Sequence, residues 1–202
     1  MLIKFLLDFL NYYSDGILAL SAFVAAIAGI FGIDVWKKKM KGKLDHDIAR
    51  KFLKSILELR DATKIVRSPF IPVSEMYDAL KNQGMDEKEI EDKLGNNKEV
   101  YRAVYSLRWN KLQKVWFDLE SISLEAEVSW GKQVVDVQKK LDEYIRELRS
   151  VVWLFVNYPE SFNKKHEENR KILYGTYDEN DKYYLKIENE ISKIKEFLEK
   201  YL

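Results

Sequence analysis

Residues 16–33 read GILALSAFVAAIAGIFGI, and none of their side chains is charged. An α-helix that crosses a bilayer needs roughly 20 mainly apolar residues. Adding Val35 and Trp36, which follow the single charge of Asp34, brings the run to that length. The stretch therefore predicts one transmembrane helix, which we place within residues 14–40 together with its basic flank.

The residues on both sides of this run predict where the helix leaves the bilayer and which way it points. Aromatic side chains favour the membrane interface, and the run is bordered by Tyr12, Tyr13 and Trp36. Lysines follow at once, namely Lys37, Lys38, Lys39, Lys41 and Lys43, whereas only Lys4 precedes the run. Because lysine-rich flanks stay in the cytoplasm, we expect an outside N-terminus and a cytoplasmic C-terminal part.

Two other interpretations of the apolar run stay open. Ala26-Ile27-Ala28 has the look of a signal-peptide cleavage site, although the apolar stretch continues past it and no basic cluster precedes it. The run could instead be a buried helix of a soluble protein. Its length, its lysine-rich exit and its aromatic flanks argue against that interpretation.

The chain before the run predicts a second contact with the membrane. Residues 2–13 (LIKFLLDFLNYY) are apolar except at three positions on one helical face: Lys4, Asp8 and Asn11. We expect residues 1–13 to form an amphipathic helix that lies on the outer membrane surface. Ser14-Asp15-Gly16 would separate this helix from the spanning one, with Ser14 or Asp15 as the N-cap.

Small side chains recur every four residues within the run. One series is Ser21, Ala25 and Gly29, and the other is Ala28 and Gly32. Such spacing lets two membrane helices approach closely, so we expect this face to contribute to self-association. The alternative is that Ala and Gly are simply common in membrane helices.

The remainder of the chain, residues 44–202, shows helical periodicity. Apolar residues recur at intervals of three and four in long stretches at 44–66, 97–128, 131–158 and 178–201. Two shorter helices are expected at 74–82 and 86–93. Since amphipathic helices bury their apolar faces only against one another, the sequence predicts an all-α protein. Its cytoplasmic part would be a four-helix bundle with two short inserted helices.

Polar and helix-breaking residues predict the ends of these helices. Residues that commonly cap helices precede the second and the last long stretch: Asn96 or Asn97, and Asp178 or Asn180. Gly131 is expected to mark the turn between the second and third long helices. Residues 160–177 are polar and are expected to form a loop after Pro159.

The composition argues against several classes of function. Charged residues make up 33% of the chain but balance to a net charge of +1, which is unlike a general nucleic-acid binder. The absence of Cys excludes thiol nucleophiles and cysteine-based zinc sites. His46 and His166 lie in no metal-binding pattern, and there is no glycine-rich phosphate loop. We therefore expect no cofactor, no nucleic-acid partner and no enzymatic activity with a recognisable signature.

Arginine interrupts the apolar helix faces at three positions. Arg108 falls in the middle of the apolar stripe of its helix, and Arg60 and Arg67 fall within the apolar arc of the first long stretch. Because arginine is rarely buried without a partner, we expect buried ion pairs. The acids considered as partners are Asp61, Glu120, Glu127 and Glu190. The alternative is a pocket for an anionic ligand or for the acidic segment of a partner.

Three segments of the chain look familiar. They are residues 36–67 (beginning WKKKMKGKLDHD) with Ser68-Pro69-Phe70, residues 124–131 (LEAEVSWG) and residues 197–202 (FLEKYL). Together they resemble an uncharacterised family of small bacterial proteins with one N-terminal membrane helix and a helical cytoplasmic domain. The resemblance implies a bacterial or phage-borne origin and so the bacterial inner membrane, and it carries over no functional residues.

Three hypotheses about function are compatible with these features. The first is a non-enzymatic, membrane-anchored interaction or scaffold module, which binds a protein partner or copies of itself while its anchor in membrane lipid raises the local concentration. The second is a membrane-perturbing effector whose cytoplasmic domain senses a signal. The third is an enzyme or anionic-ligand binder with a site near Arg60, Arg67 and Arg108. We favour the first because catalytic motifs are absent from a well-patterned set of helices.

Overall fold

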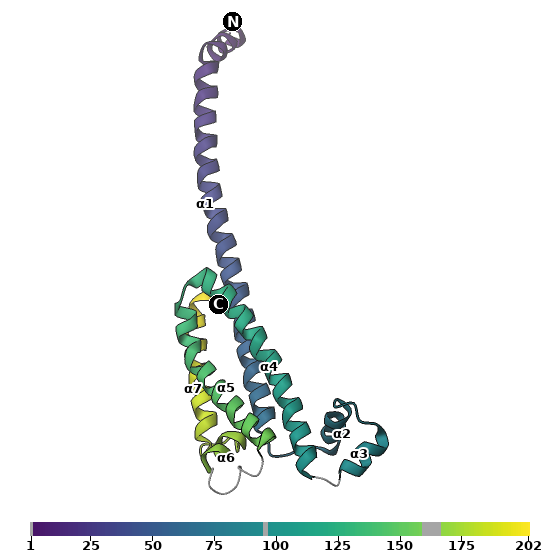
Figure 1. The fold of residues 1–202 in the computed structure, drawn as a ribbon. Coiled ribbons are helices and arrows are strands. Elements are labelled where there is room, and N and C mark those ends of the chain that lie inside the picture. The colour runs from purple at the N-terminus through teal and green to yellow at the C-terminus, as the bar shows by residue number, and fades with distance from the viewer. Residues whose placement is uncertain (1, 95–96, 159–166) are drawn as a thin grey trace. The chain divides into compact units, whose positions relative to one another are not determined.

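The structure, a computed structural model, describes residues 2–94, 97–158 and 167–202 (Figure 1). Within these ranges every secondary-structure element is a helix, which confirms the predicted all-α class. The chain divides after Asp45 into two compact units.

The first unit consists of the N-terminal part of α1, a helix that spans Leu2–Arg67. Helical structure continues through Ser14-Asp15-Gly16, where the sequence predicts a separation of two helices, although α1 bends sharply near its N-terminal end (Figure 1). The physical reason is that a single glycine weakens a helix by only about 1 kcal/mol, whereas only proline removes a hydrogen bond and clashes.

The apolar part of α1 is exposed along its whole length. Among the described residues, α1 alone contains a segment long and apolar enough to cross a membrane, with a mean hydropathy of 2.2 and no part of that segment buried. A core helix of a soluble protein would be covered by its own chain. Residues 18–36 are exposed at every position, uncovered by the described part of the chain.

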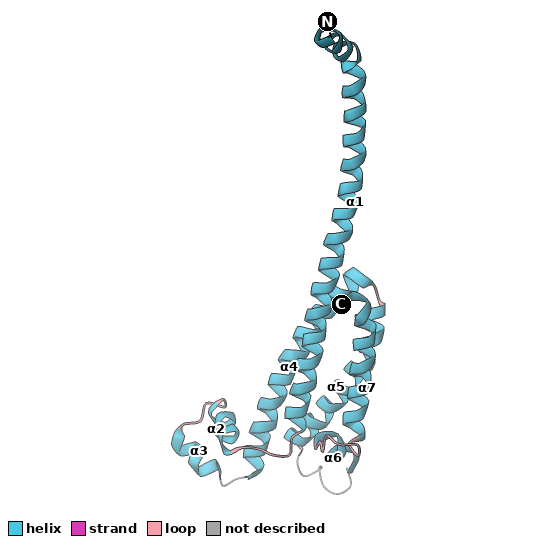
Figure 2. Ribbon diagram, turned by 180° about the vertical axis from the view of Figure 1, so that it is seen from behind, coloured by secondary structure: helices cyan, strands magenta, loops and turns pink. Residues whose placement is uncertain are grey.

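The second unit contains the C-terminal part of α1 and the remaining helices (Figure 2). These are α2 (Val73–Lys81), α3 (Glu87–Leu94), α4 (Asn97–Trp130), α5 (Gln133–Asn157), α6 (Glu167–Leu173), α7 (Lys182–Leu198) and the 3-10 helix η3 (Glu199–Tyr201). The bounds of α2 and α3 agree to within a residue with the two short helices expected from the sequence.

One apolar core holds the second unit together. Its buried side chains come mainly from α1, α4, α5 and α7, as at Ile56, Leu112, Ile145 and Ile191, each of which is 0% exposed. Helix α5 packs against both α4 and α7, while α2 and α3 pack against α4. The periodic faces identified in the sequence are therefore the faces that are buried.

The ends of the helices agree only in part with the sequence. Gly131 adopts a positive φ of 80° between α4 and α5, which confirms the predicted turn. Helix α6 lies within the segment expected to be a loop, and the N-cap of α7 is Asp181 rather than Asp178 or Asn180. The predictions for Asn96 and Pro159 fall outside the described residues.

Candidate functional site

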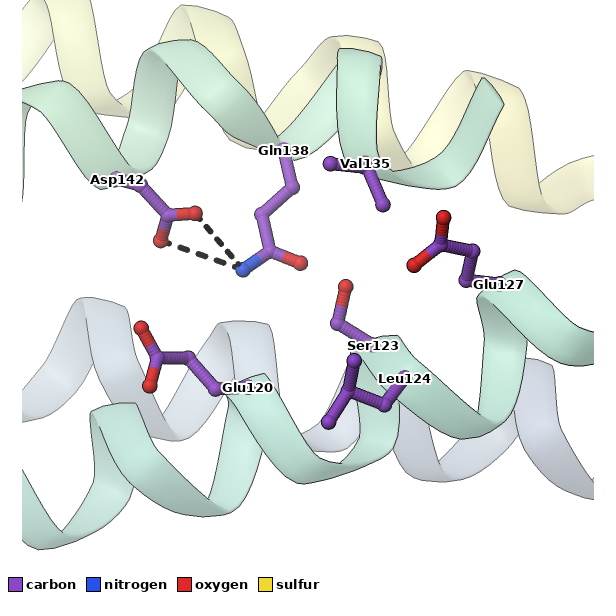
Figure 3. A pocket seen from close by; sticks show the side chains of 7 residues that line it. All are labelled: Glu120, Ser123, Leu124, Glu127, Val135, Gln138 and Asp142. Atoms are coloured by element: carbon purple, nitrogen blue, oxygen red, sulfur yellow. Dashed lines mark hydrogen bonds between the residues drawn. The ribbon is translucent and has the colours of Figure 1, made fainter. Parts of the chain in front are cut away.

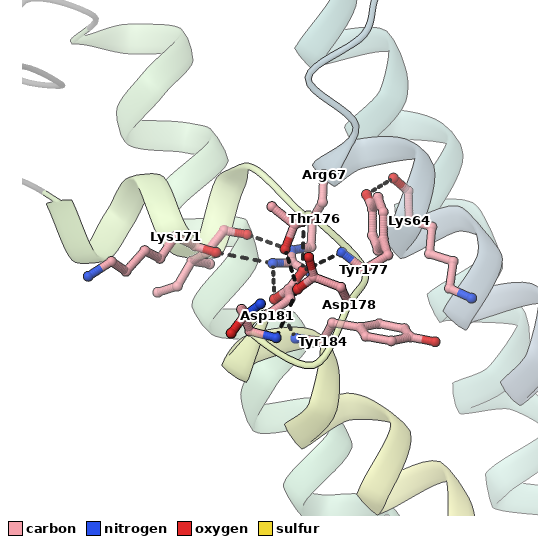
Figure 4. Close-up of polar contacts among 10 residues, drawn as sticks. Lys64, Arg67, Lys171, Thr176, Tyr177, Asp178, Asp181 and Tyr184 are labelled. Carbon is pink, nitrogen blue, oxygen red and sulfur yellow. Dashed lines mark hydrogen bonds and ion pairs between the residues drawn. The ribbon is translucent and has the colours of Figure 1, made fainter.

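The first candidate site surrounds Arg67, the last residue of α1, whose side chain is 1% exposed. Its Nη2 lies 2.8 Å from Oδ1 of Asp181. The same guanidinium donates to the carbonyl oxygens of Ile172 at 2.7 Å and Lys171 at 3.1 Å (Figure 4). These carbonyls lie in the last turn of α6, where no helical N–H is left to pair with them. Arg67 therefore joins α1, α6 and the start of α7.

Asp181 is the acceptor at the centre of this network (Figure 4). Its Oδ1 accepts from the backbone N–H of Tyr184 at 2.9 Å, and its Oδ2 accepts from those of Thr176 and Tyr177 at 3.1 and 3.2 Å. Burial by itself would raise the pKa of Asp181, but the hydrogen bonds from Arg67 and the backbone outweigh burial and lower it. Both carboxylate oxygens of Asp181 therefore accept hydrogen bonds from the protein itself, which indicates a structural role.

Arg108 forms a separate network with α2 and with the segment that precedes it. Its guanidinium makes a two-pronged ion pair with Glu75, at 2.8 Å to Oε1 and 2.7 Å to Oε2. It also donates to the carbonyl oxygens of Ser68 at 2.6 Å and Phe70 at 2.8 Å. With its side chain 3% exposed, Arg108 has the geometry of a buried and paired structural arginine.

Arg60 does not join the other two arginines. It is partly exposed and pairs with its neighbour Asp61 at 2.9 Å, an interaction that raises the pKa of Arg60. Its second acidic neighbour is Glu188 on α7, at 4.0 Å. The sequence anticipated Asp61 as a partner, but it missed Asp181 and Glu75. The available signal was that both of these acids stand at the start of a helix, where carboxylates are favoured.

The residues singled out in and beside the apolar segment of α1 are exposed wherever their side chains are described. A side chain added at Gly29 or Gly32 would meet nothing within 4 Å, so no described residue of the chain packs against the small-residue face there. Lys37, Lys38 and Lys39 are likewise exposed, as are Ser21, Ala25 and Ala28. The side chains of Tyr12 and Trp36 are 81% and 62% exposed, whereas that of Tyr13 lies outside the described residues.

A second candidate site lies along the outer side of α4 and α5. Large apolar side chains remain uncovered there: Phe117 (54% exposed), Leu124 (65%), Val128 (90%), Val135 (41%) and Trp153 (56%). Of these five, Trp153 lines a cavity of about 190 Å³ together with Trp109 and Arg149. We call this set of five exposed apolar residues the α4–α5 surface.

A second cavity, of about 280 Å³, opens on the same surface (Figure 3). Its apolar walls are Leu124 and Val135, and its polar lining is Glu120, Ser123, Glu127, Gln138 and Asp142. Gln138 is only 3% exposed, and its Nε2 donates to both oxygens of Asp142 at 3.1 and 3.2 Å. We call it the acidic cavity. The sequence held a signal for it, because Gln138 is a polar residue in register with buried Val134 and Leu141.

The described part of the chain contains no assembled metal-binding cluster. No group of three or more His, Asp or Glu side chains is placed there to hold a metal ion, and His166 lies outside that part. Comparisons with protein-family models, with curated proteins and with solved structures find no match to this chain.

Proposed function

We propose that this protein is a membrane-anchored interaction module that binds a protein partner through the α4–α5 surface. In this proposal the apolar segment of α1 spans the bacterial inner membrane with the N-terminus outside. The helices after Asp45 form a four-helix bundle in the cytoplasm, with α2 and α3 inserted after its first helix.

The exposed apolar side chains of the α4–α5 surface are the observation that carries this proposal. Leu124 and Val128 lie one turn apart on α4, and Val135 of α5 lines the acidic cavity together with Leu124. Single exposed apolar residues are common on proteins, but several large exposed apolar side chains on two neighbouring helices, some of them beside a cavity, are typical of surfaces that bind other proteins. The core of the second unit is already closed without these side chains.

The membrane part of the proposal is supported by the exposure and the flanks of the apolar segment. Its window of mean hydropathy 2.2 is uncovered, and Lys37, Lys38 and Lys39 follow it. Anchoring would restrict the α4–α5 surface to the membrane neighbourhood and so raise its effective concentration toward partners there.

Site-specific photo-cross-linking in the native membrane tests the proposal. A photoreactive residue replaces Val128, which is 90% exposed on the surface, or Glu196, an exposed polar position on α7 that serves as the control. We expect a discrete product of higher mass from position 128 and none from position 196. No product at 128, or equal products at both positions, would contradict the proposal.

A matched pair of substitutions shows whether the apolar side chains themselves are responsible. With the photoreactive group moved to Val135, we expect Leu124→Ser with Val128→Ser to reduce the product several-fold. Both side chains are exposed, so the helical circular dichroism and the melting temperature should stay nearly unchanged. An undiminished product would show that the partner docks elsewhere.

A further inference from the structure

The side-chain amide of Gln138 is buried in the acidic cavity with only half of its hydrogen-bonding capacity used. Carboxylate oxygens only accept hydrogen bonds, so the two contacts with Asp142 require Nε2 to face that carboxylate. The orientation of the amide is thereby fixed, and Oε1 faces the cavity on the side of Ser123 (Figure 3). Among the described residues this oxygen has no hydrogen-bond partner.

The charges around Oε1 are all negative. Glu120 and Glu127 line the cavity, and neither carboxylate has an ion pair or hydrogen bond with the described part of the chain. The third carboxylate, Asp142, accepts from Nε1 of Trp116 at 3.0 Å as well as from Gln138. No Lys, Arg or His lines the cavity. A buried acceptor beside two uncompensated carboxylates calls for a positively charged hydrogen-bond donor.

The volume of the acidic cavity and the residues of its walls indicate which kind of cation it can hold. At about 30 Å³ per liquid water, a cavity of about 280 Å³ exceeds what a single metal ion needs. The described residues also hold no cluster placed to coordinate a metal ion. Leu124 and Val135 supply apolar walls on which an alkyl stem can lie while its charged end reaches the carboxylates.

We propose that the acidic cavity receives the cationic end of a lysine or arginine side chain from a partner protein. This inference rests on the proposed function and names the chemistry of the partner's contact residue. A protein is favoured over a free polyamine because Leu124 and Val135 line the cavity and Val128 lies one turn from Leu124 on α4, and these side chains are 65%, 41% and 90% exposed. A protein segment covers these side chains while it inserts its basic residue, whereas a free polyamine leaves them in water.

The test uses the full chain, labelled with ¹⁵N in detergent micelles, and N-acetyl-lysine methylamide as the probe. The reporters are the side-chain amide of Gln138 and the indole N–H of Trp116, which both donate to Asp142. We expect saturable chemical-shift changes in both, and none with N-acetyl-norleucine methylamide, which has an alkyl side chain without the charge. The indole N–H of Trp153, which lines the other cavity, should not respond.

Variants that remove negative charge from the acidic cavity show whether the lysine probe binds there. Glu120→Gln combined with Glu127→Gln keeps the shape of the cavity and should weaken lysine binding at least ten-fold. Glu125→Gln is the matched control: this residue lies on the same helix, pairs with Lys51 at 3.7 Å and does not line the cavity. It should leave the affinity within two-fold of the wild type.

Three results would overturn the inference. The first is no response of Gln138 and Trp116 to the lysine probe, and the second is an equal response to the norleucine probe. The third is binding of spermidine with no binding of a lysine-containing peptide, which would assign the cavity to free polyamines. None of these three results affects the proposed function, which the cross-link at Val128 tests separately. Lysine binding without that cross-link would instead remove the proposed function and keep the chemistry of the cavity.

Discussion

Three buried or partly buried arginines in this protein share one structural task, which is to satisfy carbonyl oxygens near the ends of helices. Arg67 donates to the end of α6, and Arg102 donates to Val156 at 2.6 Å and Asn157 at 3.2 Å at the end of α5. Arg108 donates to Ser68 and Phe70 just after α1. The last carbonyls of a helix have no intrahelical donor and carry partial negative charge, so a guanidinium with several N–H groups fits them well. This role accounts for arginine in apolar stripes without a bound anion.

Asp181→Asn is expected to destabilise the protein strongly. The substitution removes the charge that pairs with Arg67, and both side chains are almost fully buried, at 3% and 1% exposed. Leaving one charge of a buried pair without its partner costs about 3–5 kcal/mol. Asp178→Asn, at an exposed position three residues before Asp181, should cost about 1 kcal/mol or less. Urea unfolding followed by circular dichroism measures the difference, and equal losses for the two variants would contradict the structural role.

The lowered pKa of Asp181 predicts how the stability difference between wild type and Asp181→Asn depends on pH. The pKa of Asp181 is lowered in the folded state, so its contribution is present above the unfolded value of about 3.9 and is lost as the pH falls through the folded value. The stability gap between wild type and Asp181→Asn should therefore be full at neutral pH and should close in acid below about pH 4. A gap that did not change between neutral and acidic pH would argue against this ion pair.

Buried tyrosines predict a second, alkaline limit to stability. Burial raises the pKa of Tyr177 to about 12 and raises those of Tyr105, Tyr174 and Tyr183 above their usual value. Unfolded tyrosine loses its proton near pH 10, so stability is complete below that pH and falls as the pH rises through 10 toward the folded values. We expect the buried tyrosines to ionise at a higher pH than the exposed ones. Their near-ultraviolet tyrosinate signal should appear together with the loss of helical circular dichroism. Reversible ionisation of all 12 tyrosines near pH 10 with the helices intact would contradict this.

At the scale of elements, periodicity predicted the helices well, because burial of one face is a local property of spacing. It located α2, α3 and the turn at Gly131. It could not find the partners of Arg67 and Arg108, since Asp181 and Glu75 stand 114 and 33 positions away in sequence. It also placed the cap of α7 too early. Asp178 and Asn180 suit that role as well as Asp181 does, and only the contact with Arg67 distinguishes the three.

Charge placed in the apolar segment of α1 is expected to prevent its insertion into the membrane. Each arginine at the centre of a spanning helix costs about 2.5–3.5 kcal/mol on insertion scales, so Ala25→Arg with Gly29→Arg should cost about 5–7 kcal/mol. Gly42→Arg is the control, because an added side chain meets nothing within 4 Å there and the surrounding residues are basic. After alkaline extraction of membranes we expect wild type and control in the pellet and the double variant in the supernatant. If the double variant stayed in the pellet, the segment would not be the anchor.

At the scale of the whole molecule, the two units have different roles in the proposed function. The unit ending at Asp45 carries the uncovered apolar segment and the lysines, whereas the unit after it carries the core, the α4–α5 surface and the acidic cavity. The two units also differ in local charge, although the net charge of the chain is only +1. Lysines are concentrated after Trp36, whereas carboxylates line the acidic cavity. Orientation in the membrane therefore decides which compartment the α4–α5 surface meets.

The natural absence of Cys makes that orientation directly measurable. In Ser14→Cys the single thiol precedes the apolar segment, and in Ser192→Cys it lies at an exposed position of α7. Because the lysines follow the segment, we expect a membrane-impermeant maleimide to label intact cells carrying Ser14→Cys and to reach Ser192→Cys only after lysis. Labelling of Ser192→Cys in intact cells would place the α4–α5 surface outside the cytoplasm, where a cytoplasmic partner could not reach it. Labelling of both variants before lysis would show that the segment does not separate them across a membrane.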